Sequence, residues 1–298
     1  MLSLIRPEGP GPDDFKLSRR GLAAAALGGY AVFALSAQAD PIHTDDAGLV
    51  TETVMLPAAD RTIPGFLARP DAPGRFPVVI VVSEVFGVHE YIRDVCRRLA
   101  KLGYVALAPD FFVRSGVDLP AISDFTKIRD VVSQASDQQI MGDLRAGLDF
   151  LRRAPFADKK MAITGFCWGG AIAWLACERF REFRAGVAWY GRLTPPKPGE
   201  FLGEPERQWP IQLVSQLRAP VLGLYAGKDQ GIAVADVEAM RQALAAARKK
   251  GSEIVVYPEA QHGFHADYRA QYDAAAAQDG WSRMLLHFAR NGVAPRRV

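Results

Sequence analysis

The sequence has few of the residues that would commit it to a specialised class of protein. Only three cysteines and five histidines occur in 298 residues, which excludes a disulfide scaffold. The 36 basic and 33 acidic residues nearly balance, and no long basic run is present, so we expect no nucleic-acid partner. No group of Cys, His, Asp or Glu has metal-ligand spacing and no glycine run fits a nucleotide loop. We therefore expect neither a metal nor another cofactor.

The N-terminal region differs in composition from the rest of the chain. Ser18-Arg19-Arg20 precedes an uncharged stretch, 21–39, that is rich in alanine and glycine and ends in Ala37-Gln38-Ala39. A positive region, an apolar region and a small-x-small ending are typical of a secretory signal, and paired arginines indicate the twin-arginine route. We expect a signal peptide over 1–39 and a single domain over 40–298.

This interpretation predicts a periplasmic or secreted protein. The export machinery would be its partner during translocation, and no stable membrane association would remain after cleavage. The alternatives are an uncleaved membrane anchor, because about 18 apolar residues can span a bilayer, and a disordered arm.

From about residue 50 onward, short β-rich runs alternate with helical patterns, as in βαβ units. The apolar run Pro77–Ser83 is typical of a strand buried on both faces. The other predicted strands are 50–56, 63–68, 104–108, 160–165, 185–190, 219–226 and 253–257, the first two being edge strands joined by a turn. The predicted helices are 91–102, 138–152, 168–180, 234–249 and 274–290. Two segments, 111–136 and 192–210, have no clear pattern. The fold class is α/β, with a mostly parallel sheet covered by helices on both faces.

Gly165-Phe166-Cys167-Trp168-Gly169-Gly170 lies between a predicted strand and a predicted helix. This is the sharp strand–turn–helix arrangement of a nucleophile elbow, with cysteine in place of the usual serine. The adjacent helix N-terminus would favour the thiolate. Without its context Cys167 would be a small buried hydrophobe. Its context favours a nucleophile, which also explains a thiol left over from an odd count of three.

An elbow predicts an acid and then a histidine further along the chain. Asp229 follows the predicted strand 219–226, and His262 follows the strand 253–257. Because parallel strands end at the same edge of a sheet, Cys167, Asp229 and His262 are expected to meet there. Either residue alone would be interpreted as an ordinary surface group. Together, and in this order, they predict a catalytic triad.

The sequence resembles the dienelactone hydrolase (carboxymethylenebutenolidase) family, which has the α/β-hydrolase fold. The resemblance rests on 83–88 (Ser-Glu-Val-Phe-Gly-Val), 108–112 (Ala-Pro-Asp-Phe-Phe), the Cys167 elbow and 262–264 (His-Gly-Phe). It implies that Glu84 contacts the cysteine in the resting enzyme and, after substrate binding, helps to form the thiolate. The backbone N–H groups of Val85 and Trp168 are expected to form the oxyanion hole.

The resemblance also implies how a substrate is held. Arg114 aligns with an arginine that binds the substrate carboxylate, a task that suits the guanidinium fork. The family's second such arginine lies four residues after the histidine, where this chain has Ala266, so Arg269 replaces it only if its loop bends back. Aromatic residues near the strand ends, with Phe86 and Phe112 among them, are expected to wall the pocket.

These observations predict a cysteine hydrolase of small lactones or activated esters that forms an acyl-thioester. The first alternative is a broader esterase or thioesterase with another natural substrate, which the Ala266 departure and the exported location both leave open. The second is a non-catalytic ligand-binding relative. The complete set of Glu84, Cys167, Asp229 and His262 argues against that second alternative.

Overall fold

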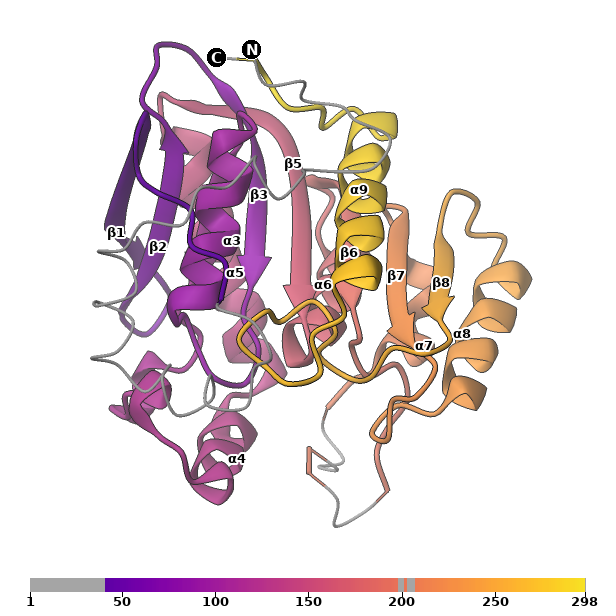
Figure 1. The fold of residues 1–298 in the computed structure, drawn as a ribbon. Coiled ribbons are helices and arrows are strands. Elements are labelled where there is room, and N and C mark those ends of the chain that lie inside the picture. The colour runs from indigo at the N-terminus through magenta and orange to yellow at the C-terminus, as the bar shows by residue number, and fades with distance from the viewer. Residues whose placement is uncertain (1–40, 198–200, 203–206, 298) are drawn as a thin grey trace.

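The apolar runs that predict strands form one eight-stranded sheet in the computed structural model, which describes residues 41–197, 201–202 and 207–297 (Figure 1). The strand order is β1-β2-β4-β3-β5-β6-β7-β8. β1 pairs with β2 and β2 with β4 in antiparallel register, and all other pairs are parallel. The strands are β1 Leu49–Pro57, β2 Thr62–Pro70, β3 Phe76–Val82, β4 Val105–Pro109, β5 Ala157–Phe166, β6 Phe183–Trp189, β7 Val221–Ala226 and β8 Glu253–Tyr257. This confirms the predicted α/β class.

The order of the parallel strands decides which face of the sheet each helix covers. The chain moves from β3 to β4 in one direction and then reverses, to β5 and on toward β8. Because such crossovers are right-handed, the helix after β3 covers one face and those after β4, β5 and β7 cover the other. Figure 1 shows α3 (Glu90–Lys101) on the near face together with the C-terminal helix α9 (Ala274–Arg290), which returns over β6 and β7. The reversal makes the space between the carboxyl ends of β3 and β5 a natural ligand site.

The helices follow the periodic segments closely. Their bounds are α3 Glu90–Lys101, α4 Phe125–Gln134, α5 Asp137–Arg153, α6 Trp168–Arg179, α7 Pro210–Leu213, α8 Val234–Ala246 and α9 Ala274–Arg290. The predicted bounds of α9 are confirmed, those of α3 and α5 differ by one residue at each end, and α6 ends one residue earlier than expected. α8 ends three residues earlier than expected.

The structure corrects the account of the first two strands. Only β1 lies at the edge, because β2 pairs with β1 on one side and with β4 on the other. Five of the nine residues of β2 are buried accordingly. The pattern-free segment 111–136 contains two short 3₁₀ turns and α4, whose buried face is Ile128, Val131 and Val132. Three apolar positions give too weak a period to predict a helix.

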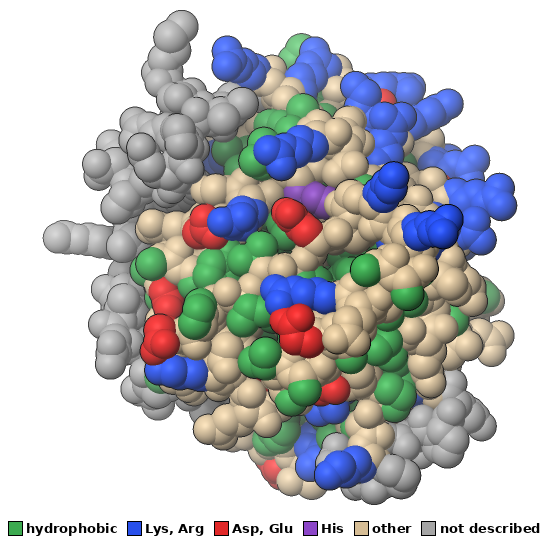
Figure 2. Space-filling view, turned by 90° about the vertical axis from the view of Figure 1, so that its right-hand side faces the viewer, with side chains coloured by type: hydrophobic (Ala, Val, Ile, Leu, Met, Phe, Trp, Pro, Cys, Tyr) green, Lys and Arg blue, Asp and Glu red, His purple; other side chains and the backbone are tan. Residues whose placement is uncertain are grey.

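β8 forms the opposite edge of the sheet and faces solvent along that edge, while α8 covers one face of β8. Ion pairs on this side join Arg241 to Glu238 and Lys228 to Glu259. Figure 2 shows this side of the molecule, where Lys and Arg side chains gather toward the upper right and acidic and apolar side chains are interspersed over the centre. Charges of both signs are therefore mixed on this side. The residues that can carry chemistry lie elsewhere, at the carboxyl ends of the strands.

Candidate active site

The turn at Cys167 has the geometry of a nucleophile elbow. β5 ends at Phe166 and α6 begins at Trp168, so a single residue reverses the chain between them. Cys167 has φ 54° and ψ −118°, a conformation that a residue with a side chain rarely adopts. Its N–H donates to the carbonyl of Trp189 on β6 at 3.0 Å, which holds the turn against the sheet. The strain therefore persists because the surrounding sheet fixes the backbone.

Two glycines allow this close approach of helix and strand. A Cβ on Gly165 would lie 2.0 Å from the carbonyl oxygen of Gly169. A Cβ on Gly169 would lie 2.4 Å from the carbonyl oxygen of Val82 and 2.5 Å from that of Ser83. Each contact involves backbone, which cannot move aside as a flexible side chain does. The glycines around Cys167 are thus a steric requirement of the turn.

The structure brings the three residues of the predicted triad into one chain of contacts. His262 Nε2 lies 3.1 Å from Cys167 Sγ, and His262 Nδ1 lies 2.7 Å from Asp229 Oδ2. The other oxygen of Asp229 accepts hydrogen bonds from the N–H groups of Gly231 and Ile232, which fixes the carboxylate. With Nδ1 donating to Asp229, Nε2 faces the sulfur and can exchange a proton with it.

The charges around His262 favour the imidazolium. Burial would lower the pKa of His262, but the negative charges of Cys167 and Asp229 and their hydrogen bonds raise it to about 10. The side chain of His262 keeps 30% of its surface exposed, whereas that of Asp229 keeps 1%. The acid is thus buried behind the histidine, and the histidine faces the cavity.

Glu84 follows β3 and is completely buried. Tyr268 donates a hydrogen bond to Glu84 Oε2 at 2.6 Å, His89 Nε2 lies 3.8 Å from the same oxygen, and an Arg269 nitrogen lies 3.8 Å from Oε1. Burial would raise the pKa of Glu84, but these neighbours together hold it below its ordinary value. In this structure the carboxylate is therefore bound to Tyr268 and its neighbours, while Cys167 contacts His262.

The loop after His262 does bend back toward the site. The N–H of Ala266 donates to the carbonyl of Gly263, and that of Arg269 donates to the carbonyl of Ala266, so the loop winds in two tight turns. Ala266 itself is buried. Arg269 lines the cavity beside Cys167, with its guanidinium carbon 5.9 Å from the centre of the Phe86 ring. The guanidinium is thus available at the site that Ala266 cannot serve.

A buried chain of charges anchors the same loop from behind. Arg98 on α3 donates to Asp267 Oδ2 and to Asp94 Oδ2, each at 2.5 Å. Asp94 Oδ1 accepts a hydrogen bond from the backbone N–H of Thr44 at 2.5 Å. Arg98, Asp94, Asp267 and Thr44 are all buried. The residue two positions before Arg269 is therefore tied through α3 to the start of the domain.

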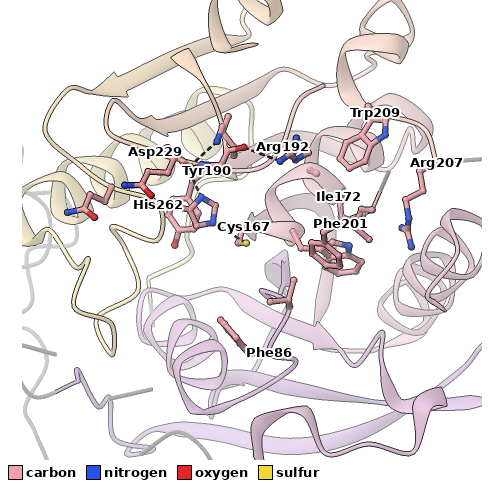
Figure 3. A pocket seen from close by; sticks show the side chains of 18 of the residues that line it. Phe86, Cys167, Ile172, Tyr190, Arg192, Phe201, Arg207, Trp209, Asp229 and His262 are labelled. Atoms are coloured by element: carbon pink, nitrogen blue, oxygen red, sulfur yellow. Dashed lines mark hydrogen bonds and ion pairs between the residues drawn. The ribbon is translucent and has the colours of Figure 1, made fainter. Parts of the chain in front are cut away.

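Cys167, His262, Asp229 and Arg269 line a cavity of about 810 Å³. Figure 3 shows Cys167, His262 and Asp229 toward one end, Phe86 below them, and Trp209 and Arg207 toward the other end. The rest of the wall is largely apolar and comes mainly from α6 and from the segment before α7. Its lining includes Val85, Trp168, Ala171, Ile172, Leu175, Tyr190, Phe201, Leu202, Trp209 and Ile232.

Two residues predicted to bind substrate lie elsewhere. The guanidinium of Arg114 makes paired hydrogen bonds of 2.6–2.8 Å with Asp60 and Asp143, and Arg114 is absent from the cavity wall. Phe112 packs its ring 4.9 Å from that of Trp168 and does not reach the cavity. Both predictions are corrected: two acids that are distant in sequence hold Arg114, and Phe112 supports the wall from behind.

Several residues at the site escaped sequence reasoning. Tyr268 holds Glu84, and Phe201 and Trp209 line the cavity from the segment 192–210, which has no secondary-structure pattern. Ala171, Ile172 and Leu175 belong to a helix that is buried all round, so no amphipathic period distinguished them. The one available signal was their spacing from Cys167, since positions 168, 171, 172 and 175 share a helix face.

No group of three or more Cys, His, Asp or Glu side chains in the described part of the chain is placed to hold a metal ion. Among the described helices, none is both long and apolar enough to cross a membrane. The predicted signal segment, 1–39, lies outside the described residues.

Comparison with known proteins places the chain among similar sequences of one family. The model of the family described as "Dienelactone hydrolase family" matches residues 63–292. A Methylorubrum extorquens protein is 47% identical over 93% of this chain and 94% of its own length, and an Escherichia coli K12 protein is 42% identical over 91% and 98%. Both bear the name "Putative carboxymethylenebutenolidase".

The fold has the same relatives. A crystal structure described as "Putative Dienelactone Hydrolase" from Klebsiella pneumoniae superposes with a TM-score of 0.75 at 43% identity, covering 81% of this chain and 99% of that one. A dienelactone hydrolase-like phosphotriesterase, P91, from metagenomic libraries has a TM-score of 0.65 at 22% identity, and this likeness concerns the fold alone.

Proposed function

We propose that Cys167 is the nucleophile of this chain, which belongs to the dienelactone hydrolase family and is a carboxylic ester hydrolase. The substrates would be small lactones or activated esters, cleaved through an acyl-thioester. The observation that carries this proposal is the unbroken contact chain from Cys167 Sγ through His262 to Asp229, at 3.1 and 2.7 Å, at the wall of a large cavity.

In the first half of the cycle, a lone pair of the Cys167 thiolate attacks the ester carbonyl carbon. The electron pair of the C=O bond moves to oxygen, where the backbone N–H groups of Val85 and Trp168 would stabilise the charge. Trp168 is the first residue of α6, so its N–H has no acceptor within the helix. Collapse of this intermediate breaks the bond to the alcohol oxygen, which leaves as an enolate or takes a proton from His262. The product is an S-acyl enzyme.

In the second half, His262 becomes the base. The charge on Cys167 is one of the main causes of its raised pKa, and that charge disappears when the sulfur is acylated. The pKa of His262 then falls toward its ordinary value, so an imidazolium that has not given its proton to the leaving group releases it to solvent or to the enolate. The neutral ring can then accept a proton from water while Asp229 holds Nδ1–H. The resulting hydroxide adds to the thioester carbonyl, the C–S bond breaks, and the carboxylic acid product leaves and loses its proton to solvent as the thiolate–imidazolium pair returns.

Glu84 has a separate place in this proposal. The family resemblance implies that it assists thiolate formation, and the bond from Tyr268 would have to be released for Glu84 to reach the sulfur. Arg269, which lines the cavity near Cys167, is the proposed partner for a substrate carboxylate, and Phe86 beside it would contact the apolar part of the substrate.

The test compares Cys167→Ala with Cys96→Ala on an activated aryl ester. Cys167→Ala should lower kcat/KM by at least about 1,000-fold, because Cys167 supplies the nucleophilic atom in contact with His262 Nε2 among the described residues. Cys96 is buried away from the cavity, so its variant should retain activity. Acid quenching of the wild type during turnover should place an acyl mass on the peptide that contains Cys167. Full activity in Cys167→Ala would overturn the proposal.

A broader esterase or thioesterase is the second candidate, and the size of the cavity favours it. At about 810 Å³ the cavity falls within the range that holds drug-sized ligands and exceeds the needs of a single-ring lactone. A panel of dienelactones, simple lactones, aryl esters and thioesters separates the two candidates. Binding without turnover across the whole panel would instead indicate a non-catalytic relative.

A further inference from the structure

One face of α6 lines the cavity from the nucleophile outward. Trp168, Ala171, Ile172 and Leu175 all lie in its wall, at positions i, i+3, i+4 and i+7 of one helix. A helix rises 1.5 Å per residue, so this stripe extends about 10 Å along the helix axis from the turn at Cys167. All four side chains are apolar, which makes the stripe a continuous apolar track that starts at the attacking sulfur.

Other parts of the cavity wall are apolar as well. Phe201 and Trp209 also line the cavity, and Figure 3 shows both on the side away from His262 and Asp229. Trp209 and Leu175 are each less than a tenth exposed. Aromatic rings facing aliphatic side chains are suited to an apolar chain or ring system.

The far end of the cavity does not present a cation to a substrate anion. Arg207 lies there, but its guanidinium donates to the backbone carbonyls of Val132, Ser133 and Ala135 at the end of α4. Arg269 by contrast lies beside Phe86 and Glu84, at the nucleophile's end. Two further cations line the cavity, but Arg192 donates to the carbonyl of Gly231 and Lys228 pairs with Glu259. We therefore assign charge recognition to the reacting end, since most of the exposed wall area is apolar.

We infer that the site takes esters or thioesters carrying an extended apolar group, about 10 Å long, that lies along α6 between Leu175 and Trp209. This inference rests on the proposed cysteine hydrolase function and adds its substrate class. A short lactone would leave most of the track filled only by water. A longer chain would displace that water and gain affinity in the transition state with each methylene that it buries.

The experiment measures kcat/KM for p-nitrophenyl alkanoates from acetate to dodecanoate, below their micelle limits. A parallel series varies the alcohol, using alkyl esters of one fixed acid. The wild type should show kcat/KM rising up to about fourfold per methylene in one of the two series, until the track is filled near eight carbons. The series in which the rise occurs identifies which side of the ester enters the track. Flat or falling profiles in both series would overturn the inference.

Two variants locate the effect. Leu175→Trp should fill the track and lower kcat/KM for the octanoate at least tenfold relative to the acetate, whereas Trp209→Ala should move the optimum to longer chains. Leu286→Trp is the matched control, because Leu286 is exposed on α9 and does not line the cavity. Acetate turnover reports whether each variant is folded. Unchanged chain-length profiles in both cavity variants would refute the assignment to α6.

A third measurement needs no substitution. The inhibition constants of the free alkanoic acids for the wild type should fall with chain length over the same range. Cys167→Ala tests the proposed cysteine hydrolase function separately. Retained turnover in this variant would refute Cys167 as the nucleophile, whatever the dependence of kcat/KM on chain length. An inactive Cys167→Ala combined with flat profiles refutes the apolar track alone.

Discussion

The buried carboxyl of Glu178 makes a prediction about stability that can be worked through in numbers. Glu178 lies on α6 with no exposed surface, and neither of its carboxyl oxygens has a hydrogen-bond partner among the described residues. Burial raises its pKa from 4.5 to about 9, with Arg179 and Lys249 acting in the opposite direction. In the folded protein this side chain therefore keeps its proton through neutral pH.

The consequence is a loss of stability as pH rises. Between about pH 4.5 and 9 the unfolded chain releases this proton and the folded chain retains it. The free energy of unfolding then falls by about 1.4 kcal/mol per pH unit from this group alone, or about 3 kcal/mol by pH 7. Glu178→Gln removes the ionisation with little change of shape. Relative to the wild type, its stability should rise by about 2.5 kcal/mol between pH 5 and pH 7, because the cost of the unpaired amide is the same at both pH values.

The assay is urea unfolding at pH 5, 6, 7 and 8, followed by tryptophan fluorescence. The decisive quantity is the difference between variant and wild type as a function of pH, because all other titrating groups cancel in it. Glu182→Gln is the control: Arg145 lowers the pKa of Glu182, so that variant should lose a little stability at neutral pH and none at low pH. A Glu178→Gln difference that stays constant from pH 5 to 8 would refute the reasoning.

Three further predictions concern the site and the N-terminus. Asp229→Asn removes a charge that raises the pKa of His262. The alkaline limb of kcat/KM for an alkyl ester, near pH 10 in the wild type, should therefore move at least one pH unit lower. An unmoved limb would contradict the contact between Asp229 and His262. Arg269→Ala should raise KM about tenfold or more for esters that bear a carboxylate and change KM for neutral esters by less than about twofold. Arg114→Ala should leave both KM values unchanged, because Asp60 and Asp143 hold its guanidinium. If Arg269→Ala weakened both ester types equally, the carboxylate role would be excluded. Edman sequencing of exported protein should begin near Asp40, and recovery of residues 1–39 in the membrane fraction would favour an anchor.

The order and register of the triad could be predicted because they depend on local patterns. Cys167, Asp229 and His262 each follow an apolar run, and runs that form parallel strands end at one edge of the sheet. The glycines around Cys167 indicated the tight turn, because a tight turn needs small residues at neighbouring positions in the sequence.

The substrate-binding residues could not be predicted in this way. Arg114 has the right chemistry for a carboxylate, but Asp60 and Asp143 hold it, and their proximity arises only from the tertiary fold. Trp209 lies in a segment without secondary-structure pattern, so only the folded structure shows that it lines the cavity. Long-range pairing and cavity shape are properties of the assembled chain.

The buried contacts that run from Thr44 to Asp267 also set a limit on how the chain can be trimmed. Thr44 lies only a few residues beyond the predicted cleavage position, and its N–H is the first link to Asp94. Proteolysis that stopped before Thr44 would leave this link intact. Loss of Thr44 would remove one of the two donors to Asp94 Oδ1 and leave Arg97 as the other. Asp94 would then be held less firmly, and with it Arg98 and the loop that carries Arg269. Any trimming that removed Thr44 would therefore also disturb the loop that brings Arg269 to the cavity wall.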